Sequence, residues 1–302
     1  MLEAFTAPGR FFKGNLHCHS TRSDGARPPA EVCTLYREAG YDFIALTDHF
    51  LERYGFPIVD TRDFRTNAFT TIVGAEVHAP AIGQGEPWHL LAVGLPLAFE
   101  RTTVGETGPD LAQRCIDAGA FLALAHPAWY GLTMADAATI AKAHAVEIYN
   151  HASEVECARG DGAYLVDQLL SAGRQIDLIA TDDAHLHRND CFGGFVQVRA
   201  EANEPEALVA ALKAGHYYAS QGPAIHHVAL AADAVEVECS AAAAVMLLGR
   251  APVAVQVVAP GTTRARLPLS RAAASGHARI VVIDAQGRKA WTNPMYFDGS
   301  SM

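Results

Sequence analysis

The sequence lacks most features that would assign it to a specialised class of protein. None of its six cysteines forms a Cys-x-x-Cys pair, which indicates a reduced chain without a zinc ribbon or a disulfide framework. No apolar run reaches the roughly 18 residues that a membrane span requires. Residues 1–13 contain no apolar segment typical of a secretory signal. We therefore expect a cytoplasmic protein that does not act at a membrane.

Basic runs are also absent, and the 302-residue chain carries a formal net charge of -10. General nucleic-acid binding through a basic surface is therefore not expected. Half of the residues are hydrophobic and 19% are charged, which is an ordinary globular composition. Because a bound metal cluster can create a positive pocket within an acidic protein, phosphorylated small molecules remain candidate substrates.

From residue 11 to about residue 222, short apolar segments alternate with helical patterns. This alternation predicts βα units around a parallel sheet or barrel. The expected strands are Phe11–Ser20, Phe43–Asp48, Thr70–His78, His89–Leu95, Phe121–His126, Val146–Asn150 and Ile176–Thr181. The expected helices are Pro28–Ala39, Asp110–Ala118, Thr133–Ala143, Ala163–Ser171 and Glu204–Ala214.

The pattern changes after Pro223, where strand-like segments follow one another without a long helix. These segments are Val228–Cys239, Ala243–Leu248, Val253–Val258, Ala278–Asp284 and Lys289–Thr292. We therefore expect two domains, a barrel over residues 1–222 and a small antiparallel β-domain over residues 223–302.

Histidines and carboxylates recur at or just past the ends of the expected strands. His17 and His19 are two apart, so within a strand their imidazoles would point into the same space. The full set is His17, His19, Asp24, His49, Glu76, His89, His126, Asp183 and His185. In a βα barrel, the ends of the strands form the face on which active sites are built. This nitrogen and oxygen donor set favours two or three ions of Mn, Zn or Fe.

These ordered motifs resemble the PHP (polymerase and histidinol phosphatase) family of metal-dependent phosphoesterases. The resemblance implies a distorted (β/α)7 barrel with a trinuclear metal site. It assigns His17, His19, Glu76 and Asp183 to one metal, with Glu76 bridging to a second metal that His89 and His126 also bind. It assigns Asp24, His49 and His185 to the third. Among these ligands, Glu76, Asp183 and His185 are the expected catalytic residues.

The expected function is that of a metal-dependent hydrolase, in which a metal-bridging hydroxide attacks a small phosphomonoester or phosphodiester. The segment between His89 and His126 is short, so the lid found in PHP phosphatases that act on nucleotides is not expected. Two stretches, Val146–Asn150 and His216–Pro223, resemble the carbaryl-hydrolase-like (CehA/McbA) branch. Carboxyl- or carbamate-ester hydrolysis at the same site is therefore one alternative, and a non-catalytic, metal-binding regulatory domain is another.

Several residues near these motifs are candidates for contacts with a small-molecule substrate. They are Arg22, Tyr130, Asn150 and His151. Asp48 and Asp182 neighbour expected ligands, and we interpret them as supporting or capping carboxylates. His78 shares a strand face with Glu76, which makes it a neighbour of the site. The sequence leaves the oligomeric state open.

Overall fold

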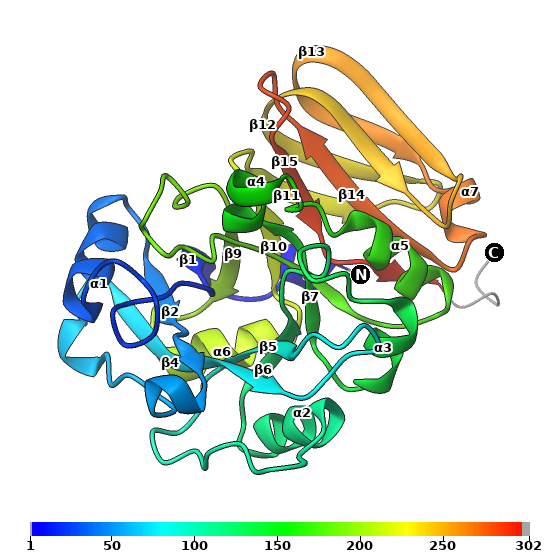
Figure 1. Ribbon diagram of the computed structural model, residues 1–302. Coiled ribbons are helices and arrows are strands. Elements are labelled where there is room, and N and C mark those ends of the chain that lie inside the picture. The colour runs from blue at the N-terminus through cyan, green and yellow to red at the C-terminus, as the bar shows by residue number, and fades with distance from the viewer. Residues whose placement is uncertain (1, 298–302) are drawn as a thin grey trace.

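The computed structural model describes residues 2–297 and shows a mixed α/β fold built on one large sheet (Figure 1). The strands of the first two thirds of the chain are β1 (Arg10–Asn15), β2 (Phe43–Leu46), β3 (His49–Phe50), β4 (Thr70–Ala79), β5 (Trp88–Val93), β6 (Phe121–Leu124), β7 (Ala145–Asn150), β8 (Asp177–Thr181), β9 (Phe195–Ala200) and β10 (Tyr217–Ser220). The remaining strands are β11 (Ile225–Leu230), β12 (Ala234–Leu248), β13 (Ala254–Pro268), β14 (His277–Ile283), β15 (Lys289–Thr292) and β16 (Met295–Tyr296).

Seven α-helices and three single-turn 3-10 helices accompany these strands within residues 2–297. The α-helices are α1 (Pro29–Glu38), α2 (Gly108–Asp117), α3 (Met134–Thr139), α4 (His151–Cys157), α5 (Ala163–Ser171), α6 (Pro205–Lys213) and α7 (Ser270–Ala273). The 3-10 helices are η1 (Glu3–Phe5), η2 (Glu52–Tyr54) and η3 (Arg62–Phe64). None of the helices in this part of the chain has the length and apolarity needed to cross a membrane.

The sheet is mixed rather than parallel, which corrects the expectation from the sequence. Strands β1, β2 and β4 are parallel, as are β6, β7 and β8, but β5 runs antiparallel to both β4 and β6. The physical reason is the connection from β4 to β5, a loop without a helix. Parallel neighbours need a long crossover, whereas a short loop returns the chain antiparallel.

Strands β1, β2 and β4–β9 curve around a shared apolar core. This core includes Phe12 and Leu16 at β1, Phe43 from β2, Ile179 from β8 and Val196 from β9. Strand β8 lies against β9 and β10, but within residues 2–297 no ladder of hydrogen bonds joins them, so the sheet is not closed. The (β/α)7 barrel therefore remains a prediction.

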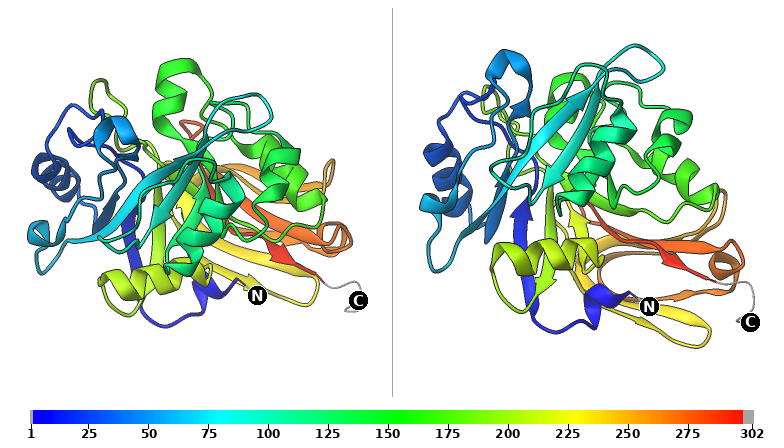
Figure 2. Two further views of the ribbon diagram at one scale, coloured as in Figure 1. Left: turned by 60° about the horizontal axis from the view of Figure 1, so that its bottom comes forward. Right: turned by 90° about the horizontal axis from the view of Figure 1, so that it is seen from below.

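The strands after Pro223 form an antiparallel sheet that continues from the first through the pairing of β10 with β15. The expected strand Val228–Cys239 is wrong as a single element, because a turn at residues 231–233 separates β11 from β12. In Figure 2 the N-terminal segment lies beside these strands, and Leu2, Ala4 and Phe5 pack into their apolar core. The domain boundary near residue 223 stays a prediction.

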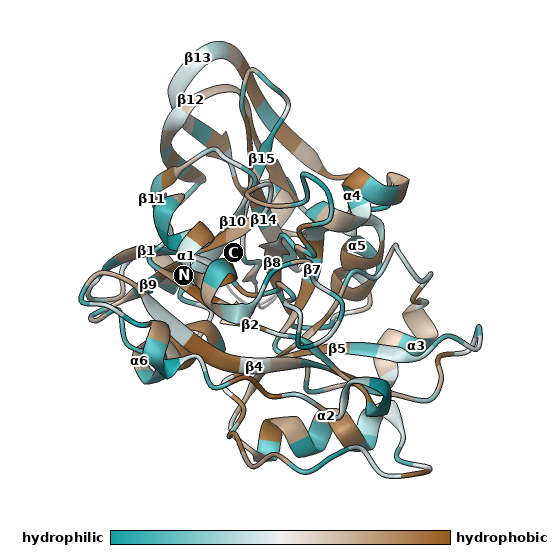
Figure 3. Cartoon of the chain, turned by 60° about the vertical axis from the view of Figure 1, so that its left-hand side comes forward, coloured by the Kyte–Doolittle hydropathy of each residue, from teal (hydrophilic) through white to brown (hydrophobic). Residues whose placement is uncertain are grey.

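Local sequence signals explain both ends of helix α1 and the start of helix α4. Helix α1 begins at the Pro28-Pro29 pair, and Gly40, with φ of +79°, follows its end. Helix α4 was not expected, because its seven residues lie directly after a strand. The Asn150 side chain caps this helix by accepting a hydrogen bond from the backbone N–H of Ser153 at 2.9 Å. Figure 3 shows hydrophobic residues concentrated in strands such as β4 and β7.

Candidate metal centre

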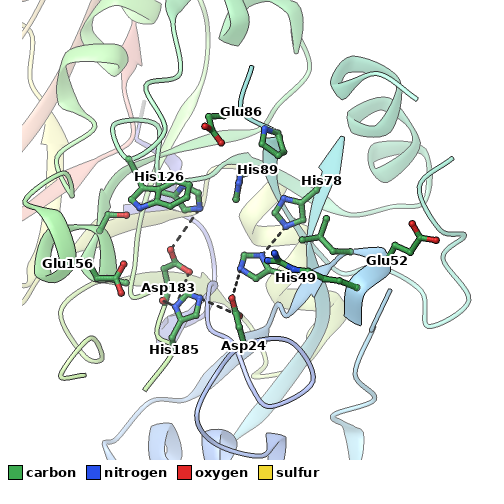
Figure 4. Close-up of a pocket in the computed structure, with 16 residues that line it drawn as sticks. Asp24, His49, Glu52, His78, Glu86, His89, His126, Glu156, Asp183 and His185 are labelled. Carbon is green, nitrogen blue, oxygen red and sulfur yellow. Dashed lines mark hydrogen bonds and ion pairs between the residues drawn. The ribbon is translucent and has the colours of Figure 1, made fainter. Parts of the chain in front are cut away.

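The structure brings all nine of the predicted ligands together around the floor of one cavity. The cavity has a volume of about 700 Å³, and Asp24, His49, His89, His126, Asp183 and His185 line it (Figure 4). Glu76, His17 and His19 lie behind them and are fully buried. Several of these residues lie just after the end of a strand, as the spacing predicts: His17 and His19 follow β1, His126 follows β6, and Asp183 and His185 follow β8.

Glu76 lies at the centre of the cluster. Its Oε1 is 2.7 Å from His89 Nδ1 and 3.0 Å from His126 Nε2. Its Oε2 is 2.6 Å from His49 Nδ1 and 3.5 Å from His17 Nε2. One carboxylate thus faces four imidazoles, an arrangement that suits a bridge between two ions.

Asp183 faces the two histidines that follow β1. Its Oδ1 is 2.9 Å from His19 Nε2 and 3.1 Å from His17 Nε2, and its Oδ2 accepts a hydrogen bond from Asn150 Nδ2 at 3.2 Å. The backbone of Asp183 has φ of +55°, a conformation that non-glycine residues rarely adopt. Such strain is common where a side chain must be held at a functional site.

Asp24 marks the outer part of the cluster. Its Oδ2 is 3.3 Å from His49 Nε2, and its Oδ1 is 3.5 Å from His185 Nε2. His185 Nδ1 lies 2.8 Å from the backbone oxygen of Asp183 and donates to it, so Nε2 is left with its lone pair toward Asp24 and the cavity.

The charges within the cluster shift the pKa values of its carboxylates. Burial alone would raise the pKa of Glu76, but the imidazoles of His49 and His89 hold that pKa well below its usual range. The pKa of Asp183 is likewise lowered, because His17 and His19 outweigh the effect of burial. Both side chains are therefore ionised at neutral pH and are available as ligands.

The donor set fits divalent metal ions. Buried atoms without a hydrogen-bond partner include His17 Nε2, His19 Nδ1, Glu76 Oε2 and His126 Nδ1. Buried polar atoms are rarely left unpaired, because desolvation without a partner costs about 1–3 kcal/mol each. Imidazole nitrogens and carboxylate oxygens also meet in four overlapping groups whose ligand atoms lie within 4.8 Å of one another. Ions bound between them would satisfy these atoms.

The four predicted substrate contacts occupy different places. Asn150 is buried and reaches Asp183, while the Tyr130 ring lies behind His89 and His126 with centroid distances of 5.3 and 5.6 Å. His151 turns toward Tyr149, with 2.9 Å between its Nδ1 and the tyrosine hydroxyl. Arg22 is exposed. None of these four residues is among those that line the cavity.

Asp48 and Asp182 cap loops beside the cluster, as interpreted from their positions. Asp48 Oδ1 accepts from the backbone N–H groups of Ser20 and Ser23, which holds the loop after His19. Asp182 accepts from three successive backbone N–H groups at residues 192–194. Both carboxylates therefore position backbone next to the predicted ligands.

One residue of the site, Glu147, was not assigned a role from the sequence. It is buried beneath His17 and contacts it directly. Trp129, which follows His126 and Pro127 and was a candidate for either the pocket wall or packing, forms part of the cavity wall. His78, expected only as a neighbour, lies with its Nε2 3.0 Å from His49 Nδ1 and its Nδ1 3.1 Å from the oxygen of Trp88. A glutamate inside the apolar strand segment Val146–Asn150 was the available signal for Glu147, because a buried carboxylate needs partners.

The fold and the cluster together define a mixed α/β protein with a candidate multinuclear centre of imidazole and carboxylate ligands. The chain shares its fold with a two-domain protein from Bacteroides vulgatus that contains a predicted PHP-like metal-dependent phosphoesterase. That likeness has a TM-score of 0.53 at 16% identity and covers 96% of this chain and 98% of the other. The resemblance to PHP-like proteins is thus confirmed at the level of the fold, and the CehA/McbA branch remains a prediction.

Weaker likenesses exist to two further solved structures. One is a putative metal-dependent phosphoesterase from Bifidobacterium adolescentis, with a TM-score of 0.41, 15% identity and coverage of 57% of this chain and 87% of the other. The other is an amidohydrolase from Chromobacterium violaceum, with a TM-score of 0.40, 15% identity and coverage of 59% and 89%. No protein-family model matches the sequence, and a search of curated proteins finds no match.

Proposed function

We propose that this protein is a metal-dependent hydrolase and that its substrates are small phosphomonoesters or phosphodiesters. The observation that carries the proposal is the convergence of six imidazoles and three carboxylates on the floor of an open cavity, with buried ligand atoms left unpaired. A purely structural cluster would be expected to pair these atoms with one another. The intact set also argues against the non-catalytic regulatory alternative.

In this proposal the ligands divide among two or three divalent ions of Mn, Zn or Fe. His17, His19, Glu76 and Asp183 form one position, and Glu76 extends to a second with His89 and His126. Asp24, His49 and His185 form the third. When bound, such ions lower the pKa of water and neutralise charge that develops on the substrate.

The chain's own residues prepare the cavity for the reaction. Asn150 holds Asp183 through Oδ2, so that Oδ1 stays directed at His17 and His19. The His185 side chain is 22% exposed, more than those of His49, His89 and His126, and therefore has the best access to substrate. Outside the cluster, the exposed indole of Trp129, together with Leu51 and Pro87, adds an apolar wall to the cavity for a leaving group.

The charge of a multinuclear site favours phosphoryl over carbonyl substrates. A multinuclear site supplies more positive charge than a neutral carbonyl requires, and an anionic phosphoryl group uses that charge. Arg53 is the one arginine or lysine among the residues that line the cavity, so the metals would have to neutralise the phosphoryl oxygens. The apolar wall is the observation that favours the second candidate, a carboxyl- or carbamate-ester hydrolase acting through the same ligands.

The deciding experiment compares matched p-nitrophenyl esters. The purified protein is stripped with chelator and reloaded separately with Mn and Zn, and kcat/KM is measured on p-nitrophenyl phosphate, a p-nitrophenyl phosphodiester and p-nitrophenyl acetate. We expect metal-dependent turnover with a phosphoester preferred. An advantage of more than tenfold for acetate, about 1.4 kcal/mol in transition-state binding, would replace the phosphoesterase proposal with the carbonyl alternative. Failure to bind either metal would refute both.

A further inference from the structure

Glu147 is a fully buried carboxylate outside the predicted ligand set that accepts hydrogen bonds on both oxygens. Its Oε1 lies 2.9 Å from His17 Nδ1 and accepts from the Thr181 hydroxyl at 2.6 Å. Its Oε2 accepts from the backbone N–H of His126 at 2.6 Å and from Asn150 Nδ2 at 2.8 Å. Through these partners Glu147 contacts one predicted ligand directly, the backbone of a second, and the amide that holds Asp183.

The contact with His17 fixes which nitrogen of that ring carries the proton. Because a carboxylate can only accept, His17 Nδ1 must be the donor. The other nitrogen, Nε2, lies 3.1 Å from Asp183 Oδ1 and 3.5 Å from Glu76 Oε2 and has no hydrogen-bond partner of its own, so in the neutral ring its lone pair points into the cluster. This is the tautomer that a metal ligand needs, because the ion binds the unprotonated nitrogen.

We infer that Glu147 is a positioning residue of the metal centre: it holds His17 in the metal-binding tautomer and orientation without contacting metal or substrate itself. The inference rests on the proposed metal site. Residues with this role commonly change metal affinity by 10- to 100-fold when they are replaced.

The surroundings of Glu147 make a glutamine at this position informative. In Glu147→Gln the side-chain NH₂ must face one of the two donor pairs. The backbone N–H of His126 cannot become an acceptor, so the amide oxygen is required on that side. The NH₂ group then faces Thr181 and His17. The Thr181 hydroxyl can rotate to accept, but His17 can accept only by moving its proton to Nε2, which removes the lone pair from the cluster.

Metal affinity is the readout that separates this role from a general contribution to folding. The affinity of the full-length protein for Zn is measured by competition with a chelator of known affinity, and metal content is measured alongside. We expect Glu147→Gln to lose affinity by 10- to 100-fold. Thr181→Val is the matched control, because it removes a hydrogen bond to the same Oε1 but leaves the His17 contact, and it should stay within about threefold of wild type. Equal losses in both variants would overturn the inference.

A double-mutant cycle tests whether Glu147 acts through His17. In a His17→Ala background, Glu147→Gln should change Zn affinity by less than about twofold, because the group that it positions is gone. A further loss of tenfold or more would overturn the inference. If Glu147→Gln does not fold, Glu147→Asp replaces it, since it keeps the charge but retracts the carboxylate by one methylene. If the wild-type protein binds Zn but hydrolyses no ester, the proposed function is refuted. The double-mutant cycle still tests the role of Glu147 in that case, because it is measured as Zn affinity.

Discussion

Asp177 should make the stability of this protein fall as the pH rises, and the effect can be separated from the metal centre. Asp177 begins β8, at the opposite end of the strand from Asp183. Its carboxylate packs close to Gly215, and within residues 2–297 no hydrogen bond or ion pair reaches it. Burial raises the pKa of Asp177 from its usual 3.8 to about 7.

The direction of this pH dependence follows from which state of the protein, folded or unfolded, holds the proton. Between pH 4 and pH 7 the folded protein keeps a proton on Asp177 that the unfolded chain has already released, so the free energy of unfolding decreases as pH rises. The decrease is complete above the folded-state pKa. A shift of about three pKa units corresponds to about 4 kcal/mol, and because Asp177 is partly exposed this is an upper value.

The substitution Asp177→Asn removes the titration with little change in shape. We expect its urea midpoint and melting temperature to equal those of wild type near pH 4 and to exceed them above pH 7.5. Measuring both proteins after chelation, in parallel, cancels the pH dependence of the metal ligands. Asp63→Asn, at an exposed aspartate, is the matched control and should show no such trend. A difference between Asp177→Asn and wild type that stays constant from pH 4 to pH 8 would refute the reasoning.

Three further predictions concern the site. His17→Ala and Asp183→Ala should each reduce turnover of the preferred ester by more than tenfold, and activity within tenfold of wild type would contradict their assignment. Circular dichroism should show a retained fold in both variants, because the apolar core does not include these side chains. Chelation should lower the melting temperature and reloading with Mn or Zn should restore it, since ions that bind only the folded state stabilise it, and an unchanged melting temperature would count against the centre. Trp129→Ala should raise KM for p-nitrophenyl phosphate about two- to tenfold, because an aromatic contact with the substrate is lost. Arg22 lies outside the cavity wall, so the KM of Arg22→Ala should stay within twofold of wild type. A larger rise in KM for Arg22→Ala than for Trp129→Ala would show that the substrate binds elsewhere.

The positions of the metal-ligand candidates were predictable because they depend on a local rule. All of these side chains except Asp24, which lies in a loop, follow or lie within an apolar strand, and strand ends that share one edge of a sheet bring their side chains together. The structure places all nine around one cavity. Strands β7 and β8 and helices α1 and α5 also lie within about two residues of their predicted bounds, because apolar runs, proline starts and glycine stops mark them.

Two elements were missed although local signals for them exist. The apolar residues of strand β9 alternate, and Asn150 caps helix α4, but α4 is only seven residues long and lies directly after a strand. Arg22 was expected to contact substrate because it lies between the ligands His19 and Asp24, and His151 because it follows the end of a strand. Neither position fixes where a side chain points, and neither residue lines the cavity.

By itself the sequence determined the donor chemistry of this protein, because the types and order of its histidines and carboxylates indicate a multinuclear metal site before any coordinates are known. Only the tertiary structure decided how these donors are held. Glu147 meets His17 across 130 residues of sequence, and Asp183 meets His19 across 164. Hydrogen bonds of this kind depend on distances and angles that arise when distant strands pack against one another, and no local pattern encodes them.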